Sequence, residues 1–118
     1  MKEFLIFRTD RVGDFLFSLL IIKLIKKNYP NSNITLVASE KNYEYAKTFN
    51  VIDKIIILKK NLFSKINLVF KLRKKKYDVI IIHDGKNRSK FISFFLKTKK
   101  KISCATDLKN TQIEIIKI

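Results

Sequence analysis

The sequence contains 118 residues with a mass of 14.0 kDa, the size of one small domain. Hydrophobic residues make up 47% of the chain and charged residues 31%, so it can form a packed core, which excludes an intrinsically disordered protein. The single cysteine, Cys104, excludes a disulfide framework and a cysteine-based zinc site within the chain, and the single histidine, His83, excludes a histidine-pair metal motif. We therefore expect a metal-free intracellular domain.

The chain is strongly basic, with 26 Lys and Arg against 10 Asp and Glu and a net charge of +16. Such a charge favours a nucleic acid or an anionic membrane as partner. However, only four of the cations are arginines, and the abundance of Lys, Ile, Asn and Phe is typical of A/T-rich coding. The arginines are therefore the informative cations, and they are Arg8, Arg11, Arg73 and Arg88.

Neither a membrane span nor an export signal is expected. The longest apolar stretch, residues 15–25, is interrupted by Lys23 and is shorter than the ~20 residues that a span requires. Glu3, Asp10 and Asp14 lie where a signal peptide carries positive charge. We expect a cytoplasmic protein, with at most peripheral contact with the inner membrane.

The first half of the chain alternates between strand and helix patterns. A short continuous apolar run predicts a strand buried on both faces, and a long segment without Gly or Pro predicts a helix that packs on a sheet. The expected elements are a strand at 4–7, a helix at 15–28, a strand at 34–38 and a helix at 39–49 capped by Ser39 or Asn42.

The second half continues the alternation. The expected elements are a strand at 54–58, a helix at 62–75 with one apolar stripe (Phe63, Ile66, Val69, Phe70), a strand at 78–82, a helix at 89–96 and a strand that begins at 101–103. This order predicts a single α/β domain over residues 1–103, a Rossmann-like parallel sheet covered by helices. Residues 104–118 are expected to be a tail, the truncated start of an interdomain region.

The loop between the first strand and the first helix carries four ionised residues within residues 8–14. Ligands of open α/β sheets bind beyond the carboxyl ends of the strands, which is where this loop lies. Gly13 permits a close backbone approach, and Asp14 lies at or next to the helix N-cap. Asp14 is therefore either a helix cap or a general base toward a hydroxyl. Arg8 and Arg11 either orient an anionic ligand or form ion pairs with the neighbouring aspartates.

The loop after the fourth strand, residues 83–89, is the second candidate. Gly85 allows a sharp turn, and Arg88 and Ser89 begin a helix whose N–H groups could bind phosphate. The loop has the spacing of neither a dinucleotide fingerprint nor a P-loop. His83 is open to two interpretations, a core histidine or a catalytic one.

Several segments together resemble glycosyltransferase family 9, the heptosyltransferases of the lipopolysaccharide inner core. The most specific is Arg8-Thr9-Asp10-Arg11-Val12-Gly13-Asp14, followed by an apolar helix and the run Lys26-Lys27-Asn28-Tyr29-Pro30-Asn31. The similarity continues in order through residues 34–37, 51–55, 72–78 and 85–89. It covers nearly all of residues 3–103, and it implies the N-terminal domain of such an enzyme.

The resemblance implies an inverting GT-B glycosyltransferase that needs no metal. Residues 1–103 would form the acceptor-binding domain. This domain binds no cofactor, and an ADP-heptose-like nucleotide sugar would bind in a C-terminal domain that this chain lacks. Asp14 would be the catalytic base. The residues that would bind the anionic lipopolysaccharide-core acceptor are Arg8, Thr9, Asp10, Arg11, Gly13, Gly85, Arg88 and Ser89. The family commonly has Asp-x-His-Gly where this chain has Ile82-His83-Asp84-Gly85, so His83 and Asp84 inherit no role.

Two other functions stay open at this point. The chain ends about where the family's first domain ends, so we expect it to be inactive without a donor-binding domain or partner chain, and a truncated inactive relative is one alternative. The other is a small basic α/β module that binds nucleic acid. The lysines are scattered over all elements without the aromatic and basic interleaving of RNA-binding domains, which makes nucleic acid the weaker interpretation.

Overall fold

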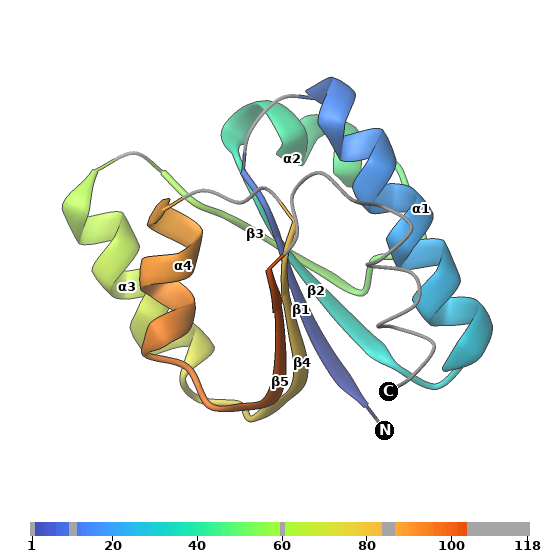
Figure 1. The fold of residues 1–118 in the computed structure, drawn as a ribbon. Helices are drawn as coiled ribbons and strands as arrows, with labels where there is room; N and C mark the ends of the chain where they lie inside the picture. The colour runs from blue at the N-terminus through green and yellow to red at the C-terminus, as the bar shows by residue number, and fades with distance from the viewer. Residues whose placement is uncertain (1, 10–11, 60, 84–86, 104–118) are drawn as a thin grey trace.

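The computed structural model describes residues 2–9, 12–59, 61–83 and 87–103, and these residues form an alternating α/β domain (Figure 1). The elements are β1 (Glu3–Arg8), α1 (Val12–Asn28), β2 (Asn33–Ala38), α2 (Glu40–Ala46), β3 (Lys54–Ile57), α3 (Leu62–Leu72), β4 (Tyr77–Ile82), α4 (Asn87–Phe94) and β5 (Thr98–Ser103). The predicted alternation is confirmed, with shorter α2 and α3 than expected. The predicted tail at 104–118 lies outside the described residues.

The five strands are parallel and lie in the order β3-β2-β1-β4-β5. The chain moves outward from β1 to β3, then crosses back to β4 on the other side of β1 and continues to β5. The helices α1 and α2 lie on one face of the sheet, and α3 and α4 lie on the other (Figure 1). The strand order therefore reverses between β1 and β4, and the carboxyl ends of these two strands form the topological switch point.

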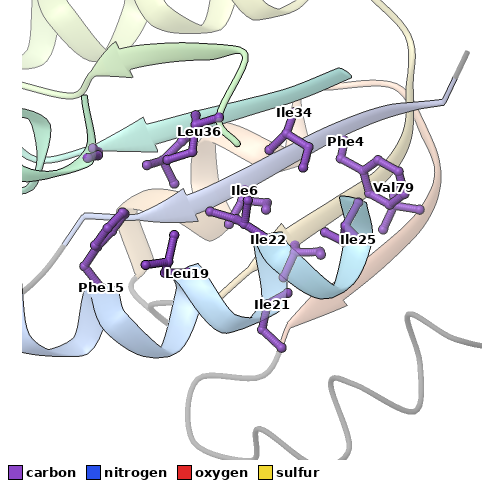
Figure 2. Close-up of a cluster of buried hydrophobic side chains, with 14 of the residues drawn as sticks. Phe4, Ile6, Phe15, Leu19, Ile21, Ile22, Ile25, Ile34, Leu36 and Val79 are labelled. Carbon is purple, nitrogen blue, oxygen red and sulfur yellow. The ribbon is translucent and has the colours of Figure 1, made fainter. Parts of the chain in front are cut away.

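Each face of the sheet has its own hydrophobic core. Along β1, Phe4 and Ile6 belong to the cluster under α1 and α2, whereas Leu5 and Phe7 belong to the cluster under α3 and α4. Figure 2 shows the first cluster, in which Ile22 and other apolar side chains of α1 pack against the sheet. This alternation explains the continuous apolar runs, because both sides of a central strand are covered by helices.

The apolar stripe expected on α3 is not the face that packs on the sheet. Leu68 and Leu72 are the buried residues of this helix, whereas Phe63, Ile66 and Phe70 are exposed. Apolar residues occur nearly all round α3, so the sequence period alone does not indicate which side contacts the sheet. Helix α2 behaves as expected at its start, where the Ser39 side chain accepts a hydrogen bond from the Asn42 amide and caps the helix.

Asp53, in the segment before β3, connects three parts of the fold. One carboxylate oxygen accepts hydrogen bonds from the Ile34 amide at 2.8 Å and from Lys26 Nζ at 2.9 Å. Lys26 also donates to the Ser32 carbonyl at 2.6 Å. Burial by itself would raise the pKa of Asp53, but the Lys26 and Ile34 hydrogen bonds outweigh it and hold that pKa below its ordinary value. The carboxylate thereby ties the end of α1 to β2.

We expect Asp53→Ala to lower the free energy of unfolding by about 1 kcal/mol near neutral pH, because it removes two hydrogen bonds to the Asp53 carboxylate. A lowered carboxyl pKa stabilises the fold above the unfolded-state value of about 4 and loses this effect as the pH falls through the folded-state value. The difference in unfolding free energy between Asp53→Ala and wild type should therefore vanish in acid. Urea denaturation at several pH values measures it. Glu44→Ala, which removes an exposed partner of Lys47, is the control and should change little.

Candidate functional site

The candidate site lies at the carboxyl edge of the sheet, where β1 and β4 end side by side. The two segments that the sequence singled out, after Arg8 and after Ile82, both begin at this edge. They are held together by the backbone, because the His83 amide donates to the Phe7 carbonyl at 3.1 Å. The residues at which the two predicted loops begin thus lie at the topological switch point, the usual ligand position in such a sheet.

A buried polar chain runs from β1 through α1 to the end of β4. Arg8 Nε donates to Ser18 Oγ at 2.7 Å, and Ser18 Oγ lies 2.7 Å from His83 Nδ1. All three side chains are almost completely buried. The Arg8 guanidinium can only donate hydrogen bonds, so Ser18 Oγ accepts the bond from Arg8, and the serine hydroxyl can donate a hydrogen bond to His83 Nδ1. In that arrangement Nδ1 is an acceptor, so the imidazole is neutral and carries its proton on Nε2.

A second contact joins the two loops directly. Arg88, in the first turn of α4, donates from Nε to Thr9 Oγ1 at 3.0 Å and from Nη2 to the Thr9 carbonyl at 2.6 Å. Thr9 is buried, whereas Arg88 is partly exposed. A single guanidinium therefore fixes the backbone after β1 while part of its surface faces solvent. This places a positive charge at the edge where an anionic ligand would approach.

The site contains two residues that sequence reasoning missed. Ser18 lies within the apolar pattern of α1, and Asn42 was considered only as a helix cap. The Asn42 side chain donates from Nδ2 to the Arg8 carbonyl at 3.1 Å, so α2 also supports the end of β1. A polar residue at a position of α1 that faces the sheet was the signal that could have identified Ser18, because a buried hydroxyl requires a partner.

The remaining predicted residues are only partly placed. Gly13 and Asp14 are the second and third residues of α1, so Asp14 lies in the first helical turn, slightly further into the helix than expected. Ser89 is buried in the first turn of α4. The other predicted residues of the two loops lie outside the described residues, and they are Asp10, Arg11, Asp84 and Gly85.

Neither a metal-ligand cluster nor a membrane-spanning helix occurs in the part of the chain that the structure describes. Residues 2–9, 12–59, 61–83 and 87–103 contain no group of three His, Cys, Asp or Glu side chains arranged to hold a metal ion. Within the same ranges, no helix has both the length and the apolar character needed to cross a bilayer.

The sequence matches no family model, and no curated protein matches it. The fold, however, is shared with solved glycosyltransferases. A glycosyl transferase family 9 structure from Veillonella parvula superposes with a TM-score of 0.81 at 17% identity, covering 98% of this chain and 41% of that one. Heptosyltransferase WaaC of E. coli, solved with ADP, superposes with a TM-score of 0.78 at 14% identity, and the match covers 98% of this chain and 47% of WaaC. The E. coli ADP-heptose lps heptosyltransferase II superposes with a TM-score of 0.72 at 19% identity, and the match covers 93% of this chain and 34% of that one.

These superpositions use nearly all of this chain, and the chain spans less than half the length of each of the three structures. At such low identity the likeness concerns the path of the backbone rather than the chemistry of individual residues. The parallel sheet, its strand order and its covering helices therefore agree with the resemblance deduced from the sequence. The chain has the Rossmann-like fold that forms part of the GT-B glycosyltransferases of family 9.

Proposed function

We propose that this chain is the acceptor-binding part of an inverting glycosyltransferase that resembles the ADP-heptose:lipopolysaccharide heptosyltransferases. The observation that supports the proposal most is that Arg88 contacts Thr9, and that the His83 amide contacts the end of β1, at the switch point of a sheet with the fold of solved heptosyltransferases. The donor would be a nucleotide sugar of the ADP-heptose kind, bound by a separate donor-binding domain. The acceptor would be a lipopolysaccharide core or a similar anionic glycan.

In the proposed reaction Asp14 acts as the general base. Its carboxylate removes the proton from an acceptor hydroxyl while that oxygen attacks the anomeric carbon of the donor sugar. The bond from the anomeric carbon to the nucleoside diphosphate breaks on the opposite side, so the configuration inverts and the electron pair leaves with the diphosphate. The position of Asp14 in the first turn of α1, at the carboxyl edge of the sheet, is compatible with this role.

The acceptor would be held by the cations and small residues of the two loops. Arg88 is partly exposed, and a guanidinium binds phosphates and carboxylates with paired hydrogen bonds, so we assign it the most direct contact. Arg8 is buried, so we assign it the support of the loop and of His83. The remaining proposed acceptor residues are Thr9, Asp10, Arg11, Gly13, Gly85 and Ser89. The proposal includes no metal, a cytoplasmic location and peripheral contact with the inner membrane.

Acceptor binding can be tested with this chain alone. We expect a phosphorylated inner-core oligosaccharide without lipid to bind in isothermal titration, and Arg88→Met to weaken the binding by about 10-fold or more, because one charged hydrogen-bond donor is lost. Arg73→Met removes an exposed arginine at the end of α3 and should leave the affinity unchanged. Equal affinity of the Arg88→Met variant and wild type would contradict the assignment of Arg88. Tighter binding of an oligonucleotide than of the glycan would favour the nucleic-acid alternative.

A further inference from the structure

The outer surface of α3 and α4 carries large apolar side chains that the fold leaves exposed. We call the following residues the α3–α4 apolar face: Leu62 (67% exposed), Ile66 (43%), Phe70 (63%), Phe91 (58%) and Phe95 (42%). They line one groove together with Lys65, Val69 and Arg73. The two helices lie side by side on one face of the sheet (Figure 1).

The spacing shows that these residues form a continuous surface. Leu62, Ile66 and Phe70 recur every four residues and form one stripe along α3, and Phe91 of α4 is followed four residues later by Phe95, just past the end of that helix. The rings of Phe91 and Phe95 are 5.1 Å apart and contact edge to face. Single exposed apolar residues are ordinary, but a contiguous patch of this kind marks a surface that contacts an apolar partner.

The charge around the face identifies the chemistry of that partner. The two helices that carry the face hold Lys65, Lys71, Arg88 and Lys90 and no acidic residue. Lys65 and Arg73 lie on the rim of the groove itself. An apolar strip within a basic rim is complementary to a surface that is anionic outside and apolar beneath.

We propose that the α3–α4 apolar face docks on the surface of an anionic phospholipid bilayer. The phenylalanine rings would enter the boundary between headgroups and acyl chains, and the lysines and Arg73 would contact the phosphates. A second copy of this chain fits the face less well, because a two-fold interface would bring two basic rims together. The inference deepens the peripheral membrane contact included in the proposed function, because it names the surface that makes the contact, and docking itself requires neither donor nor acceptor.

Co-sedimentation with vesicles tests the proposal on the 118-residue chain. The vesicles are phosphatidylcholine alone or with about a quarter phosphatidylglycerol, at about 0.1 M and 0.5 M NaCl. We expect binding to the anionic vesicles, and Phe70→Ser combined with Phe91→Ser should lower the partition coefficient by about 10-fold or more, because two exposed rings are lost. The matched control is Phe17→Ser with Leu20→Ser, two residues on α1 that are 51% and 50% exposed, and it should bind like wild type.

A second variant separates the electrostatic contribution. Lys65→Glu with Arg73→Glu leaves the apolar residues intact and should weaken the preference for phosphatidylglycerol. Circular dichroism confirms that each variant is folded. Equal vesicle binding by the Phe70/Phe91 variant and wild type would overturn the proposal. The proposal would also be overturned if the wild type did not bind vesicles and sedimentation equilibrium showed a wild-type dimer that Phe70→Ser with Phe91→Ser converts to a monomer. The acceptor titration uses a lipid-free glycan, so a failure of the proposed acceptor binding can be told apart from a failure of the proposed membrane docking.

Discussion

Asp14→Asn is expected to lower the rate of sugar transfer by about 10²- to 10⁴-fold, the usual contribution of a general base, when this chain is assayed together with a donor-binding domain. The amide has nearly the shape of the carboxylate but cannot take a proton from the acceptor hydroxyl. Since the loss concerns a step after binding, the affinity for the acceptor glycan should change little. The measurement is the initial rate of nucleoside diphosphate release at saturating acceptor.

The same substitution separates catalysis from helix capping. Asparagine satisfies helix N-terminal N–H groups about as well as aspartate does, so a role limited to capping predicts an unchanged rate. Any effect of the lost charge on the helix dipole is a stability effect of about 0.3–1 kcal/mol, visible in denaturation rather than in turnover. Glu40→Gln is the control, because Glu40 occupies the first turn of α2, another helix that follows a strand of the same sheet. A wild-type rate for Asp14→Asn would reduce Asp14 to a structural residue.

The sheet was predictable because its central strands are apolar on both faces. The run at residues 4–7 and the run at 78–82 have no polar alternation, and this pattern is typical of strands covered by helices on both sides. The order of segments then predicts parallel crossovers, and the structure confirms them. Helix α3 was different, since apolar residues nearly all round it left open which side would meet the sheet.

The candidate site was predictable only in its position. The sequence indicated which loops follow strands, and parallel strands bring their carboxyl ends to the same edge. It did not indicate that Ser18 would meet His83, because these residues are 65 positions apart and their contact depends on the packing of α1 against the end of β4. Contacts of this kind arise from the tertiary arrangement and leave no local signature.

The buried contact of Ser18 leads to the second prediction with a large effect. We expect Ser18→Ala to lower the free energy of unfolding by about 1–3 kcal/mol, because it removes a buried hydrogen-bond partner of Arg8 Nε and of His83 Nδ1. Urea denaturation measures the loss. Ser93→Ala is the matched control, since Ser93 is also buried but its hydroxyl donates only to the Lys90 carbonyl within its own helix.

A spectroscopic measurement distinguishes the polar chain from a general packing defect. His83 is the single histidine of the sequence, so its imidazole nitrogens give isolated signals in a long-range ¹H–¹⁵N spectrum. If Ser18 donates to Nδ1, the wild-type ring is the neutral Nε2–H tautomer, and Ser18→Ala should move the Nδ1 signal while Ser93→Ala leaves it in place. An unchanged Nδ1 signal together with a loss of stability would mean that Ser18 contributes packing alone. The link between the two segments would then depend on the Arg88–Thr9 contact and on the backbone hydrogen bond from His83 to Phe7.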